Sequence, residues 1–190
     1  MSLSVVLRRI SSALDEFGIE YMLTGSLVSS GYGRPRSTND IDIVIEANPE
    51  QLHSFIQQLE KNDYYADLDT ALQAQRHESL FNVIDRKTSW KIDLIFRKSR
   101  PYSNEAFRRR RLLELEGVKV YVASVEDIII AKMEWAKQAQ SQRQIEDVVS
   151  ILKLRGQDLD ELYLQNWIQQ LGLNSEWEAV RRDSGFPEKS

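Results

Sequence analysis

The sequence predicts a mixed α+β fold in which a sheet-containing part is followed by a purely helical part. Short apolar runs, several of them with alternating polar and apolar positions, indicate strands, and these fall at residues 21–23, 41–46, 80–85, 90–96 and 118–122. Helical periodicity appears between these runs, and only helical periodicity follows residue 122. We therefore expect an α+β (α/β mixed) core over residues 1–122, a helical C-terminal extension over 123–184 and a tail over 185–190.

Composition narrows the class of protein. The chain has 190 residues, of which 42% are hydrophobic and 28% charged, so it can bury a core and does not resemble a disordered chain. Cysteine is absent, which excludes disulfides and thiolate catalysis and agrees with a reducing, cytoplasmic compartment. We expect no signal peptide, because the apolar stretch at the N-terminus is too short and is soon followed by Arg8 and Arg9. We expect no membrane partner, because the sequence holds no apolar run of about eighteen residues. The net charge of −4 argues against a general polyanion binder.

Local signals place the elements of the first part in order. Residues 3–17 have helical spacing and end before Gly18, and residues 27–32 suit one or two helical turns. Asn48 and Pro49 begin a helix, residues 63–70 look irregular, and residues 71–75 suit a short helix. The strands 80–85 and 90–96 form a hairpin.

The second part begins at Ser124, an N-cap residue with Asp127 at the capping-box position. The pattern then predicts a run of helices, at residues 124–138, 141–154, 159–171 and 175–183.

Two aspartates on one strand are the first candidate site. Asp40 and Asp42 stand at i and i+2, so their side chains share one face about 7 Å apart at Cα, while the isoleucines between and after them face a core. Aspartate is depleted in strands, and a like-charged pair repels unless a cation lies between its members. The alternative is ordinary polar-out alternation. A Gly25-Ser26 turn precedes the pair, and a lone Asp93 follows on a later strand.

This order of features resembles the nucleotidyltransferase superfamily typified by DNA polymerase β. The resemblance implies that Gly25 and Ser26 hold the phosphates of a nucleotide at a helix start. It also implies that Asp40, Asp42 and Asp93 are the metal-binding and catalytic carboxylates, with two Mg²⁺ ions, or Mn²⁺ in their place, and an NTP as substrate. Asp93 would act on the attacking hydroxyl. An exposed strand face is the simpler interpretation of Asp93.

Flanking residues are similar to one branch of that superfamily, which contains AbiEii-type toxins and aminoglycoside nucleotidyltransferases. The similar segments are RPRSTNDID at 34–42, SVEDIIIAKM at 124–133 and RQIEDVV at 143–149. Two departures are the long interval between Ser26 and Asp40 and the apolar Leu27 after the serine. The branch implies a nucleotidyltransferase with an RNA, protein or small-molecule acceptor, and a partner protein, as in toxin–antitoxin pairs, or a homodimer. The alternatives are a non-catalytic nucleotide-binding or partner-binding module and a helical interaction protein.

Basic residues supply the remaining candidates. Lys132 lies within an apolar helical stripe, where a buried ammonium needs a partner such as a triphosphate, unless it reaches solvent along the stripe. Arg36, with Arg34 beside it, could contact nucleotide phosphates or lie in a solvated loop. Arg143 and Asp147 suit a surface pair at i and i+4. The four arginines at 108–111 are expected on a helix, as a solvated face or as part of a nucleic-acid patch.

Overall fold

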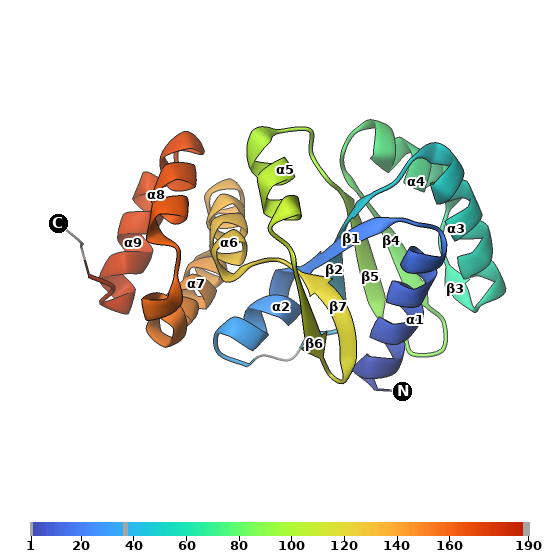
Figure 1. Cartoon of the computed structure of the whole chain (residues 1–190), viewed down its shortest axis with the longest axis horizontal. Coiled ribbons are helices and arrows are strands. Elements are labelled where there is room, and N and C mark those ends of the chain that lie inside the picture. The colour runs from blue at the N-terminus through green and yellow to red at the C-terminus, as the bar shows by residue number, and fades with distance from the viewer. Residues whose placement is uncertain (1, 36–37, 188–190) are drawn as a thin grey trace. The chain divides into compact units, whose positions relative to one another are not determined.

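The computed structural model describes residues 2–35 and 38–187. The chain forms two compact units, the first of Met1–Ser26 and Thr38–Ala123 and the second of Leu27–Ser37 and Ser124–Ser190. Figure 1 shows the elements of both units along the chain. The domain boundaries expected from the sequence stay a prediction.

A seven-stranded mixed sheet forms the first unit, with the strand order β3-β4-β5-β2-β1-β7-β6 (Figure 1). The strands are β1 (Glu20–Thr24), β2 (Asp40–Glu46), β3 (Tyr64–Tyr65), β4 (Leu80–Asp85), β5 (Lys91–Phe96), β6 (Arg111–Leu115) and β7 (Val118–Val122). Strand β2 pairs with β5 in parallel and with β1 antiparallel, and β1 pairs with β7 in parallel. The predicted α+β class with a mixed sheet is confirmed.

Four helices complete this unit, namely α1 (Leu3–Glu16), α3 (Pro49–Lys61), α4 (Leu68–Arg76) and α5 (Pro101–Arg108). The alternating isoleucines of β2, Ile41, Ile43 and Ile45, are fully buried, as period-2 alternation requires. Helix α3 begins with a capping box in which the side chains of Asn48 and Gln51 bond each other's backbone N–H groups. These local signals fix the direction in which β2 presents its aspartates, which is away from the apolar core.

The expectation of a helix through the four arginines at 108–111 is wrong. Helix α5 ends at Arg108, and Arg111 is the first residue of edge strand β6. Strand β6 forms a hairpin with β7 through Glu116 and Gly117, whose φ values of 51° and 74° suit a type I′ turn. The Glu116-Gly117 dipeptide was the available signal, because it joins two runs in which polar and apolar residues can alternate as in strands. Residues 63–70, expected to be irregular, contain β3 and the start of α4.

Helices form the second unit: α6 (Val125–Ala139), α7 (Gln142–Arg155), the short 3₁₀ helix η1 (Gly156–Asp158), α8 (Glu161–Gln170) and α9 (Asn174–Ser184). Helix α2 (Gly25–Tyr32) starts in the first unit, and its residues from Leu27 onward belong to the second. The side chain of Ser124 caps α6 by accepting from the Asp127 backbone N–H, as the capping-box pattern predicts. Within the described residues, no helix combines the length and the apolar character that a membrane crossing requires.

Candidate active site

The three predicted aspartates meet on two neighbouring strands. In the parallel pair of β2 and β5, Asp40 stands opposite Lys91 and Asp42 stands opposite Asp93. Paired positions on adjacent strands lie about 5 Å apart and face the same side of the sheet. Asp40, Asp42 and Asp93 therefore project from one face, and the side chain of Asp93 is 13% exposed. The sheet order, rather than any local pattern, brings Asp93 to this place.

The predicted Gly-Ser turn adjoins the same carboxylates. Strand β1 ends with Thr24 opposite Asp42, and Gly25 then turns the chain with a φ of +68°. A Cβ atom at Gly25 would lie 2.8 Å from the Cβ of Asp42 and closer still to its carboxylate. The backbone N–H of Ser26, at the start of α2, donates a hydrogen bond to Asp42. Only glycine fits this position, because it tolerates the positive φ and leaves room for the carboxylate.

The electrostatics of Asp42 show an uncompensated charge. Burial raises the pKa of the Asp42 carboxyl, and the nearby charges of Asp93 and Asp40 raise it further. Lys91 and the Ser26 N–H act in the opposite direction without cancelling the shift. The ionised form of Asp42 is thus disfavoured in this site, and an added cation would favour it.

Two residues that the sequence analysis did not single out bind Asp93. Asn82 of β4 donates from Nδ2 to Oδ1 of Asp93 over 2.5 Å, and Lys91 donates from Nζ to Oδ2 over 2.8 Å. The hydrogen bond to Asp93 is the largest cause that raises the pKa of Lys91. The Lys-x-Asp spacing on β5 was the available signal for Lys91, because i and i+2 share a face. Asn82 could not be found in this way, since its place depends on the pairing of β4 with β5.

The donor set suits a hard divalent cation in part. Asp40 and Asp42 offer carboxylate oxygens from one rigid strand, which is the kind of ligand that Mg²⁺ prefers. In residues 2–35 and 38–187, however, no three His, Cys, Asp or Glu side chains are grouped closely enough to hold a metal ion as they stand. Both oxygens of Asp93 accept a hydrogen bond in this structure, one from Asn82 and one from Lys91.

The remaining predicted residues fall elsewhere. Lys132 of α6 is 5% exposed and does not reach solvent along its apolar stripe. Its Nζ contacts Asp147 over 2.7 Å and Gln144 over 3.0 Å, both on α7. Asp147 thus contacts Lys132, and its expected pair with Arg143 stays a prediction. Arg36 lies outside the described residues, and nucleotide binding by Arg36 and Lys132 stays a prediction.

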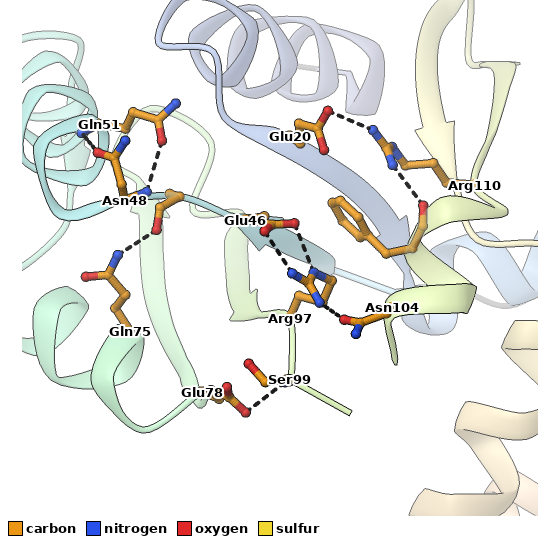
Figure 2. Close-up of polar contacts among 12 residues, drawn as sticks. Glu20, Glu46, Asn48, Gln51, Gln75, Glu78, Arg97, Ser99, Asn104 and Arg110 are labelled. Carbon is orange, nitrogen blue, oxygen red and sulfur yellow. Dashed lines mark hydrogen bonds and ion pairs between the residues drawn. The ribbon is translucent and has the colours of Figure 1, made fainter. Parts of the chain in front are cut away.

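A second polar hollow lies at the opposite ends of β2 and β5, with a volume of about 380 Å³. Figure 2 shows that two of its arginines, Arg97 and Arg110, face acidic or amide groups of the same unit. Arg97 donates to both carboxylate oxygens of Glu46, over 2.8 and 3.0 Å, and also to Asn104. Arg110 lies 3.4 Å from Glu20. Because these charges neutralise one another, the basic stretch at 97–111 does not form a uniform anion-binding patch.

Comparison with known proteins agrees with the fold. The sequence matches no model of a known protein family, and no curated protein gives a significant match. The antibiotic-resistance factor ANT(2'')-Ia superposes with a TM-score of 0.58 at 14% identity, over 92% of this chain and 95% of that chain. A second structure of ANT(2'')-Ia, in complex with adenylyl-2''-tobramycin, gives a TM-score of 0.57 at 16% identity, over 91% of this chain and 97% of that one. The lincosamide antibiotic adenylyltransferase LnuA, bound to lincomycin, gives 0.51 at 15% identity, over 76% and 93%. The chain therefore has the nucleotidyltransferase fold, and the resemblance inferred from its motifs is confirmed at the level of the fold.

Proposed function

We propose that this chain is a Mg²⁺-dependent nucleotidyltransferase, which transfers a nucleoside monophosphate from an NTP to a hydroxyl group. One observation carries the proposal: the parallel register sets Asp42 opposite Asp93, beside the bend at Gly25 and Ser26. Acidic side chains next to a glycine bend at a helix start are the chemistry that a metal-bound triphosphate requires. The shared fold with ANT(2'')-Ia and LnuA supports the same interpretation.

Each residue has a role in this proposal. Asp40 and Asp42 would hold the divalent ion that accompanies the triphosphate, and that ion would supply charge neutralisation of the departing pyrophosphate. Gly25 lets the backbone approach the phosphates, and the Ser26 hydroxyl offers a donor to them. Asp93 faces the acceptor hydroxyl.

The reaction is an in-line displacement at the α-phosphorus. A bond forms between the acceptor oxygen and phosphorus while the bond between phosphorus and the α–β bridging oxygen breaks. Pyrophosphate leaves, and the proton of the hydroxyl passes to a base at the site, for which Asp93 is the candidate. Most of the rate enhancement in such reactions comes from positioning and charge stabilisation.

The test is transfer of label from each of the four NTPs, radiolabelled at the α-phosphate, in the presence of Mg²⁺ or Mn²⁺. Acceptors are cellular RNA, cellular protein and hydroxyl-rich small molecules, including an aminoglycoside and a lincosamide. We expect label on one acceptor class with the wild-type chain and a loss of at least about a thousandfold with Asp42→Asn. Asp69→Asn, on the exposed face of α4, is the control and should keep full activity.

A measurement of nucleotide binding distinguishes the proposed enzyme from the alternative functions. Calorimetry with a non-hydrolysable NTP and Mg²⁺ should give heat with the wild type and none with Asp42→Asn. Nucleotide binding without transfer to any acceptor would instead favour a non-catalytic nucleotide-binding module. No binding of Mg²⁺, Mn²⁺ or nucleotide at millimolar concentration would overturn the proposal.

A further inference from the structure

Lys91 brings a positive charge into the group of aspartates. Its Nζ lies 2.8 Å from Oδ2 of Asp93, and the register of β5 on β2 sets it opposite Asp40. Side chains at i and i+2 of a strand share a face, so Lys91 points to the side on which the three carboxylates stand. Its side chain is 44% exposed, yet the charges of Asp93, Asp40 and Asp42 all act to raise its pKa.

Both oxygens of Asp93 already accept a hydrogen bond. Asn82 bonds Oδ1 and Lys91 bonds Oδ2, whereas no side-chain partner of Asp40 occurs among the described residues. A divalent ion approaching Asp40 and Asp42 therefore meets two carboxylates that lack a cation of their own. An ion approaching Asp93 meets instead the Lys91 ammonium, which lies 2.8 Å from Oδ2 and repels another cation. Lysine suits this place, because its ammonium is a compact point charge with three donors.

We propose that Lys91 is a built-in cation of the site: it contacts Asp93 and holds that side chain in place, so that the chain binds a single divalent ion tightly with its nucleotide, at Asp40 and Asp42. The inference rests on the proposed function, since it concerns the ions that accompany an NTP. Lys91 is a positioning residue that acts through Asp93. The position of a second divalent ion, which the family resemblance implies, is then occupied by the lysine ammonium.

The experiment counts ions. Mn²⁺ is titrated against the full chain and followed by the electron paramagnetic resonance of free Mn²⁺, with and without a non-hydrolysable ATP analogue. The wild type should bind one Mn²⁺ per chain tightly in the presence of the analogue, and Lys91→Met should bind two. Without the analogue, Lys91→Met should bind Mn²⁺ about tenfold more tightly than the wild type, because the competing charge is gone.

Two variants serve as controls. Lys91→Arg keeps the positive charge and should retain the wild-type count. Lys87→Met removes a lysine from the loop between β4 and β5, where its Nζ contacts Asp63 over 2.6 Å with both side chains exposed. It should change neither the count nor the affinity, since that pair lies outside the site.

Thermal melting gives a second readout that a merely structural lysine would not move. In EDTA, Lys91→Met should melt below the wild type, because Asp93 loses its ammonium partner beside two further carboxylates, and Mg²⁺ should restore its melting temperature. Two tight ions in the wild type, or an unchanged Mn²⁺ count and affinity in Lys91→Met, would overturn the inference. The titration without nucleotide tests Lys91 even if no NTP binds, so failure here and failure of the proposed function are separable. If Lys91→Met does not fold, Lys91→Gln replaces it.

Discussion

The aspartates of β2 and β5 contrast with the buried charges of the helical unit. In α6, Lys132 contacts Asp147 over 2.7 Å, and Asp127 accepts from Ser124 over 2.7 Å and from Tyr163 over 2.6 Å. Each of these groups meets an opposite charge or a donor from its own unit, which is how buried polar groups contribute to a stable fold. In the sheet unit, like charges stand side by side, and burial, together with the neighbouring charges of Asp93 and Asp40, raises the pKa of Asp42.

The difference separates structural charges from charges that await a ligand. Burial alone does not distinguish them, because Asp127 is more buried than Asp42. What distinguishes them is whether the fold itself supplies compensation. A carboxylate whose ionised form the fold disfavours is a candidate functional group, since an external cation can supply the missing charge.

Gly25→Ala should have the largest effect, because it disturbs the sheet-side carboxylates directly. The added methyl is strained at a φ of +68° and overlaps Asp42, so we expect a loss of about 2–4 kcal/mol of stability. Binding of the Mg²⁺–nucleotide analogue should fall at least about a hundredfold. Urea unfolding and calorimetry measure the two effects. Gly117→Ala is the matched control: its φ is +74°, but nothing lies within 4 Å, so it should cost only about 1 kcal/mol and leave binding intact.

Lys132→Met tests the inference that the buried charges of the helical unit are structural. It leaves Asp147, whose side chain is 23% exposed, without its ammonium partner, so we expect a loss of about 2–3 kcal/mol in urea unfolding. Mg²⁺ should not restore that loss, in contrast to Lys91→Met. The double variant Lys132→Met/Asp147→Leu should recover part of it. Weaker nucleotide binding in Lys132→Met, at full occupancy of the folded state, would support the predicted nucleotide contact of Lys132 and would weaken the contrast.

Tyr163→Phe removes one donor from the buried Asp127 without changing the packing volume greatly. The hydroxyl lies 2.6 Å from Oδ1 of Asp127, so its loss should cost about 1.5–2 kcal/mol. The free energy of unfolding should fall by the same amount with EDTA and with Mg²⁺. A dependence on Mg²⁺ would show that this network is not merely structural.

Asp42→Asn should have the smallest effect on stability, and its sign is opposite to the others. Because the pKa of Asp42 is higher in the folded chain than in the unfolded chain, its ionised carboxylate destabilises the folded state. The stability that the protonated carboxyl contributes is therefore lost as the pH rises through the folded-state pKa. Asparagine does not titrate, and in EDTA at pH 7 it should raise the melting temperature by about 2–4 °C. The difference in melting temperature between Asp42→Asn and the wild type should disappear below the ordinary carboxyl pKa of about 3.9. Equal melting temperatures of the variant and the wild type at pH 7 would contradict the assigned charge imbalance.

Local patterns anticipated most elements and the residue types of the site. The alternation in DIDIVIE and KIDLIF placed the aspartates on the polar faces of two strands, and Asn48 and Ser124 marked the starts of two helices. These signals are readable because side-chain direction follows backbone periodicity of 2 or 3.6 residues. The sequence analysis missed the edge strand β6, because it assigned the arginines at 108–111 to a helix. The Glu116-Gly117 turn was the signal of the hairpin that β6 forms with β7.

The sequence by itself determined that two carboxylates share one face of a strand, because side chains at i and i+2 of a strand point to the same side. The glycine bend precedes them in the chain, and the pairing of β1 with β2 brings it beside Asp42. Only the tertiary structure decided that β5 lies beside β2 in the register that sets Asp93 against Asp42, and that Lys91 and Asn82 bind Asp93. It likewise decided that Asp147 faces Lys132. Apart from the Lys91–Asp93 pair, these contacts join residues whose separation along the chain carries no periodic signal, so packing and strand order, rather than local propensity, select them.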